Sequence, residues 1–250
     1  MNKIFTLSAA LMLCASMSMA QGIGLYVGVD CNPAASQAVT NACTTNTGTA
    51  FTAFVTAVIP PAAKPQFVGT ISIIDVQTNL PTIPDWWRAD ACRGTGFSMA
   101  ADNTIGGATC AATIWDTANP AGSNLSANLT TGGVRERFLL GTVLLPTDVF
   151  DLSGDGTTEV AIAKWTVTKA KSVTASACAG CAQGACIVLN EVQIQGTGDH
   201  QFEDYLHLTT PIGTKNWISY NTSAPGDIPV CPDAVPVRNR TWGSVKALYR

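Results

Sequence analysis

An acidic, glycine-containing loop holds the residues best suited to chemistry in this sequence. Side chains that carry oxygen occupy alternate positions of the loop: Asp151, Ser153, Asp155, Thr157 and Glu159. Calcium prefers such ligands, and Gly154 and Gly156 allow the chain to bend around an ion. The loop is not an EF-hand, because Ile162 stands where that motif has a bidentate glutamate. The pattern predicts either a calcium ion or an ordinary solvated hairpin with the glycines in its turn.

A second candidate site is a pair of aromatic residues between two acids. Trp86 and Trp87 lie between Asp85 and Asp90, and acids beside aromatic rings are typical of sugar subsites. Adjacent side chains on a strand point to opposite faces, so we expect one ring in the core and one exposed. The exposed ring is then a candidate for stacking on a carbohydrate, and simple packing is the alternative.

Signals for catalysis are weak. The segment Gly96-Phe-Ser98-Met-Ala100 has only a loose likeness to a nucleophile elbow, because it ends in Ala and lacks the strand-turn-helix context. His200, Glu203, Asp204 and His207 would share one face of a helix, but their neighbours favour an edge strand that scatters them to both faces. We therefore expect no catalytic residue and no enzyme.

A secreted hydrolase is the alternative. It would need a Ser/His pair or two carboxylates that converge in a cleft. The candidate carboxylates are Asp85, Asp90, Asp116, Glu191 and Glu203.

The first twenty residues predict export. A basic start at Lys3 precedes an apolar stretch, and Ser18-Met19-Ala20 gives a small-x-small cleavage site before Gln21. The apolar stretch is too short for a permanent anchor, and no later segment supplies the roughly 20 apolar residues of a spanning helix. We expect residues 1–20 to be a signal peptide and the protein to be secreted, extracellular or on the cell surface, without a transmembrane anchor.

Removal of the signal with Cys14 leaves an even set of cysteines, which in an exported chain predicts a disulfide framework. The set is Cys31, Cys43, Cys92, Cys110, Cys178, Cys181, Cys186 and Cys231. Closeness in sequence favours pairing of Cys31 with Cys43 and of Cys92 with Cys110, which leaves the last four for two bridges. The Cys178-x-x-Cys181 spacing also fits half a zinc site or a redox pair, but a second such motif is missing.

Composition limits the partners. Only 12% of the residues are charged, against about 25% in an average domain. The net charge is -3 and no basic run is present, so nucleic acid and anionic membranes are not expected partners. No cofactor other than calcium is predicted.

Apolar residues alternate with small or polar ones along most of the chain, which is the pattern of half-buried strands. The predicted strands are 23–29, 51–59, 67–74, 137–145, 158–167, 186–194, 205–209 and 216–220. Pro, Gly and Asn separate them, and no sustained helical period is present. The fold class predicted for residues 21–237 is an all-β, antiparallel β-sandwich of the immunoglobulin or cohesin kind.

Residues 238–250 differ from the strand pattern. Thr241 is a possible N-cap, and Trp242, Val245 and Tyr249 have the spacing of a short amphipathic helix. This tail either closes one end of the core or serves as a sorting or partner-binding segment.

The last third of the chain resembles uncharacterised secreted proteins of environmental bacteria. The resemblance rests on Cys178-Ala-Gly-Cys181, on Cys186-Ile-Val-Leu-Asn190, and on the closing Thr-Trp-Gly-x-Val-Lys-x-Leu-Tyr-Arg. It implies an exported β-sandwich and brings no activity or catalytic residue. The expected function is thus an exported, non-enzymatic structural or surface-associated protein, whose partners include carbohydrate or protein through Trp86, Trp87 or the tail. An extracellular ligand-binding module of the carbohydrate type, with an optional calcium site, is the main alternative.

Overall fold

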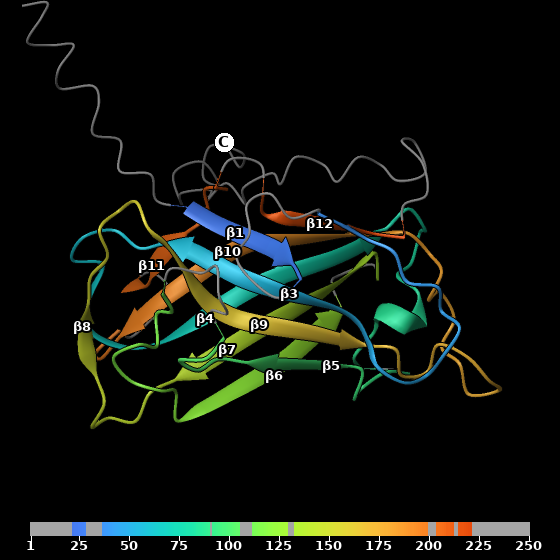
Figure 1. Cartoon of the computed structure of the whole chain (residues 1–250), viewed down its shortest axis with the longest axis horizontal. Coiled ribbons are helices and arrows are strands. Elements are labelled where there is room, and N and C mark those ends of the chain that lie inside the picture. Colours follow the sequence, from blue (N-terminus) through green and yellow to red (C-terminus); the bar gives the residue numbers. More distant parts are fainter. Residues whose placement is uncertain are drawn as a thin grey trace, which may run out of the picture.

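The computed structural model describes residues 22–28, 37–90, 92–105, 112–129, 133–199, 204–212 and 215–221. In these ranges nearly all regular structure is β-strand, arranged in the two sheets that Figure 1 shows. The predicted β-sandwich is therefore confirmed. The predicted signal peptide and the tail at 238–250 lie outside the described residues, as do Cys31, Cys110 and Cys231.

The smaller sheet has four antiparallel strands in the order β1-β3-β9-β5. Their bounds are β1 (Gly22–Val27), β3 (Thr49–Val58), β9 (Glu159–Thr168) and β5 (Phe97–Ala100). A register shift between Val55 and Thr56 of β3 marks a bulge against β9, and bulges increase the local twist of a sheet.

The larger sheet has the order β2-β12-β10-β4-β7-β6, with β11 paired to β10 and β8 paired to β4. Its strands are β2 (Ala38–Val39), β12 (Trp217–Tyr220), β10 (Ala185–Gly196), β4 (Lys64–Thr78), β7 (Arg135–Val143), β6 (Gly122–Leu129), β11 (Leu206–Leu208) and β8 (Phe150–Leu152). Pairing is antiparallel except between β12 and β2. The long central strands β4 and β10 hold the sheet together over most of their length.

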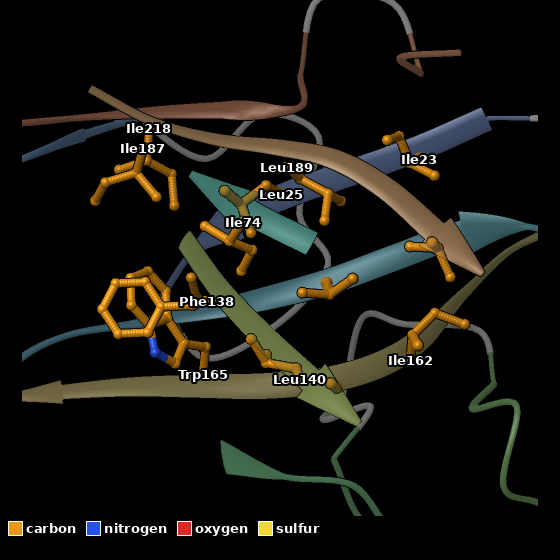
Figure 2. Close-up of a cluster of buried hydrophobic side chains, with 14 of the residues drawn as sticks. Ile23, Leu25, Ile74, Phe138, Leu140, Ile162, Trp165, Ile187, Leu189 and Ile218 are labelled. Carbon is orange, nitrogen blue, oxygen red and sulfur yellow. The ribbon is translucent and has the colours of Figure 1, made fainter. Parts of the chain in front are cut away.

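The core lies between the two sheets and follows from the alternation in sequence. Along β7, burial alternates, so that Phe138 and Leu140 point inward. Figure 2 shows these side chains facing Trp165 and Ile162 of β9 and Leu25 of β1 across the sandwich. Each fully buried side chain of this size contributes about 1.5 to 3 kcal/mol, so the interlocked inner faces fix the stacking of the sheets.

The loop between β8 and β9 lies against the end of β3. Gly154 N donates a hydrogen bond to Pro60 O, and Gly156 N donates one to Ile59 O, both at 3.0 Å. A Cβ on Gly154 would lie 2.0 Å from Ile59 O. The close approach of two backbones is therefore what requires glycine at position 154.

Substitution of Gly154 tests this contact. Gly154→Ala should lower the free energy of unfolding by about 1 to 3 kcal/mol, because two backbone segments must separate to admit the methyl group. Gly122→Ala on β6 is the control, since its added Cβ meets only Val143 Cγ1 at 3.9 Å. Urea unfolding of both variants provides the measurement, and equal stabilities would contradict the close approach.

Candidate functional site

The predicted calcium ligands extend from β8 through the β8–β9 loop to the first residue of β9, and the first two of them face the β3–β4 connection and the start of β4. Asp151 Oδ1 accepts a hydrogen bond from Gln66 N at 2.8 Å, and Ser153 Oγ accepts one from Ala62 N at 2.9 Å. Ala62 and Gln66 have positive φ angles of 51° and 47°, a region that costs energy in residues other than glycine. These side-chain acceptors therefore stabilise a strained turn.

Two of the remaining predicted ligands, Asp155 and Glu159, accept other hydrogen bonds. Asp155 Oδ1 accepts hydrogen bonds from Thr157 N at 2.7 Å and Thr158 N at 2.6 Å, and these bonds, with one from the Thr158 hydroxyl, hold the pKa of Asp155 well below its usual range. The Glu159 carboxylate accepts hydrogen bonds from the hydroxyls of Tyr26 and Thr56.

Asp151, Ser153, Asp155 and Glu159 thus accept hydrogen bonds from different groups, and Thr157 is itself a donor to Asp155. Among the residues that the structure describes, no three His, Cys, Asp or Glu side chains are placed to hold a metal ion. Calcium at this loop stays a prediction.

A pocket of about 360 Å3 lies beside the loop, at the end of the molecule where Figure 1 labels β8. We call it the β8–β9 pocket. Ile59, Ile114 and Leu152 are buried and form an apolar floor, to which the half-buried Phe150 and Val160 add. The exposed carboxylates of Asp116, Asp151 and Asp155 stand at its rim, and the hydroxyl residues Thr113, Thr117, Ser153 and Thr158 complete the lining.

The wall opposite the loop is the segment from Ala112 to Thr117. It pairs with β9, since Ile114 N donates a hydrogen bond to Ala161 O at 3.0 Å. Trp115 is fully buried, donates from Nε1 to Ile162 O at 2.8 Å and packs against Phe67. Asp116, next in the chain, is therefore held at the rim by a well-anchored neighbour.

The expected aromatic sugar site does not exist in the form predicted. Trp86 and Trp87 belong to a 3-10 helix, η2 (Asp85–Trp87), rather than a strand, and both rings are 0% exposed. The turn lets both rings enter the core, where they pack on each other at 4.8 Å and on Tyr220 at 5.4 and 4.9 Å. The prediction of an exposed ring at this position is wrong, because neither ring offers a face to a carbohydrate.

Arg93 lies within this aromatic cluster and was not singled out by the sequence. It is 1% exposed, and its guanidinium stands 3.7 Å from the centre of the Trp86 ring, within range of a cation–π interaction. Nη1 donates to Trp86 O at 2.9 Å, and Nη2 donates to the carbonyls of Gly96 and Thr168. Burial lowers the pKa of Arg93 to about 10. Only its closeness to Cys92 could have drawn attention to it.

The disulfides join segments that are far apart in the sequence. Cys43 pairs with Cys181 and Cys92 pairs with Cys178, with Cα–Cα distances of 6.0 and 5.8 Å. The predicted pairs Cys31–Cys43 and Cys92–Cys110 are therefore wrong, and so is the expectation of two bridges within the last four cysteines. Strand packing rather than sequence distance decides which cysteines meet. Cys186 is also disulfide-bonded. Since Cys178 and Cys181 are both oxidised, neither is a thiolate ligand for zinc.

The turn from Cys178 to Cys181 also supports η2 by direct contact. Trp86 N donates a hydrogen bond to Ala179 O at 2.9 Å. Gly180 has a φ of 99°, and a Cβ there would lie 2.2 Å from Pro84 Cβ. Burial raises the pKa of Tyr220 to about 12, so its hydroxyl stays protonated and donates to Cys181 O at 3.0 Å.

The weak catalytic candidates lie in separate places. Ser98 is on β5 opposite Thr166, and His207 of β11 contacts the Glu191 carboxylate on β10. Asp85 and Asp90 both form ion pairs with Arg88 at the surface. Asp116 lines the β8–β9 pocket, and His200 and Glu203 lie outside the described residues. Asp85 and Asp90 thus share one guanidinium, whereas Asp116 and Glu191 lie in other surroundings.

Glu136 is a buried acid that the sequence did not single out. It faces inward from β7 with 0% exposure, its Oε1 accepts a hydrogen bond from Ala89 N at 3.2 Å, and its Oε2 has no partner. Burial raises the pKa of Glu136, because removal from water disfavours the charged form. The sequence did offer one signal for its burial: Glu136 precedes Phe138 and Leu140 at the two-residue spacing of inward-facing strand positions.

The two disulfides give a direct prediction. Peptide mapping without reduction should recover Cys43 joined to Cys181, and Cys92 joined to Cys178. Paired Cys43→Ala and Cys181→Ala substitutions should lower the free energy of unfolding by about 3 to 5 kcal/mol, because that bridge closes a long loop of the unfolded chain. The Cys92/Cys178 pair should cost slightly less, since its sequence separation is 86 rather than 138. Recovery of a Cys31–Cys43 peptide would contradict this connectivity.

Glu136 predicts a pH dependence of stability. Between the unfolded pKa of about 4.3 and the raised folded pKa, the folded state holds the proton more tightly than the unfolded state. The stability due to Glu136 is therefore greatest below this window and falls as pH rises through it. Urea unfolding from pH 4 to pH 8 should show this fall in the parent protein and a smaller one in Glu136→Gln. Identical pH profiles would show that burial does not shift this carboxyl.

Comparison with known proteins gives a weak structural likeness. No family model matches the chain, and no curated protein matches it. Among solved structures, it is similar to the second type II cohesin module from the cellulosomal adaptor ScaA scaffoldin of Acetivibrio cellulolyticus, with 11% identity and a TM-score of 0.35. The match covers 84% of this chain and 100% of that one. No function is transferred at this similarity, and the sandwich is assigned from its own strand pairing.

Proposed function

We propose that this protein is an exported, disulfide-cross-linked β-sandwich that acts as a non-catalytic structural or surface-associated module. The observation that carries the proposal is the turn from Cys178 to Cys181, which bonds covalently to two segments 138 and 86 residues away in sequence. Structural disulfides form and persist in oxidising compartments and are rare in the cytosol. A scaffold held in this way suits exposure to an extracellular medium.

The sequence supports export independently of the bridges. Residues 1–20 have the basic, apolar and small-residue regions of a signal peptide. In the part of the chain that the structure describes, no helix has the length and apolar character needed to cross a membrane. A secreted or cell-surface location is the setting that fits these features together.

The roles of the acids support a non-catalytic function. Asp85 and Asp90 are neutralised by Arg88, Glu191 contacts His207, and Asp116 stands apart from them at the β8–β9 pocket. A glycosidase needs two carboxyl groups about 5 to 9 Å apart across its substrate. These residues instead have contacts that stabilise the sheets and the loops.

Fractionation and thiol labelling test the location. The full chain, carrying an epitope tag, is expressed in a bacterium, and each fraction is treated with a maleimide–polyethylene glycol reagent before and after reduction. We expect the protein outside the cytoplasm, shortened to begin at Gln21, with Cys43, Cys92, Cys178 and Cys181 labelled only after reduction. Cytoplasmic protein with these thiols free would refute the proposal.

A separate assay tests the absence of turnover. The purified protein is incubated with chromogenic glycosides, esters and peptides, alongside an Asp116→Asn variant. We expect no product from either protein above the rate in buffer. Turnover that disappears in the variant would make the protein a hydrolase.

A further inference from the structure

The β8–β9 pocket combines an apolar floor with an acidic rim. We propose that it binds a basic side chain of a partner protein, with the lysine or arginine stem on the floor and the cationic head among Asp116, Asp151 and Asp155. This inference rests on the proposed function, because it gives the exported module a surface for engaging a protein.

Charge complementarity is the first argument. Among the residues that the structure describes, the pocket lining contains three carboxylates and no Lys, Arg or His. The hydrogen bonds that its oxygens accept from Thr157 and Thr158 lower the pKa of Asp155, which favours its charged form. Exposed carboxylates are screened by water and salt, so each contributes little alone. Three of them around one opening nevertheless favour a cation over a neutral or anionic group.

The floor is the second argument. Ile59, Ile114 and Leu152 are at most 6% exposed, so the apolar surface at the base of the pocket is part of the packed core. The Phe150 ring is held edge-on by Phe67, with centroids 5.3 Å apart. Each methylene moved from water onto such a surface adds to the affinity. A Lys or Arg stem uses this floor, whereas a bare cation does not.

The geometry of the rim favours an organic cation over a metal ion. Calcium requires six to eight oxygens within about 2.6 Å of one point. Asp151 and Asp155 are oriented by hydrogen bonds to Gln66 N and to the 157–158 backbone instead. An ammonium or guanidinium group needs only a few acceptors and tolerates their wider spacing.

The pocket is also held in shape before any ligand arrives. Gly154 and Gly156 attach one wall to the end of β3, and the buried Trp115 anchors the other wall to β9. Binding to a preformed site loses less conformational entropy than binding to a mobile loop. The site therefore suits a weak, specific contact.

Calorimetric titration of the full chain tests the proposal with small probes. Nα-acetyl-lysine methylamide and its arginine counterpart supply stem and charge, the norleucine counterpart supplies the stem alone, and methylammonium supplies charge alone. We expect the lysine and arginine probes to bind at least ten-fold more tightly than either control, and to weaken several-fold as salt is raised. Equal affinity for the norleucine probe, or no binding by the basic probes at 20 mM, would overturn the proposal.

Variants locate the binding. Asp116 is exposed and its side chain lies at the rim, so Asp116→Asn should keep the melting temperature and weaken the lysine probe at least five-fold. Asp148→Asn is the matched control, because Asp148 is an exposed acid outside the pocket lining, and its affinity should equal that of the parent. Unchanged affinity in Asp116→Asn would place the binding elsewhere.

Calcium chloride and glucose are titrated in the same way. Calcium that binds more tightly than the lysine probe and displaces it would make the pocket a metal site, and tighter binding of glucose would make it a sugar site. Either result overturns this inference while export and cross-linking stand. In the fractionation experiment, cytoplasmic protein with free thiols would refute the proposed function. The affinities measured for the probes would still stand.

Discussion

The covalent turn from Cys178 to Cys181 is the constraint on which one end of the sandwich depends. Its two bridges reach Cys43, just before β3, and Cys92, just after η2. Its backbone accepts hydrogen bonds from Trp86 N and from the Tyr220 hydroxyl. One four-residue turn thus joins the loop at Cys43, the segment from η2 to Cys92, and strand β12, and it closes the core over the two tryptophans.

This closure explains how the core accommodates two buried ionisable groups. The Arg93 guanidinium is stabilised by three carbonyls and by the Trp86 ring. Glu136 has one N–H donor and an unpaired oxygen. Buried groups of this kind usually cost stability. The bridges limit the entropy of the unfolded chain, so the folded state tolerates that cost.

The sequence predicted the regular part of the fold and missed its edges. All eight predicted strands coincide with observed ones, because they have an apolar face that alternation reveals. The strand β6 was missed, since Gly122–Leu129 is a polar edge strand with little to bury.

The 3-10 turn at Trp86 and Trp87 was missed because a local pattern cannot show that two adjacent rings share one core. Cysteine pairing failed for a similar reason, since it depends on how the sheets stack.

The β8–β9 loop shows why a ligand pattern in sequence is ambiguous. An oxygen that suits calcium also suits a backbone N–H, and Asp151, Ser153 and Asp155 all accept such donors. The direction of the loop decides between these uses, and that direction is set by the contact of Gly154 with Ile59 and Pro60. Asp151 and Asp155, whose oxygens accept hydrogen bonds from the backbone of β4 and of the loop itself, are exposed at the surface. The same hydrogen bonds that draw them away from a common metal centre therefore leave an acidic rim around an apolar floor.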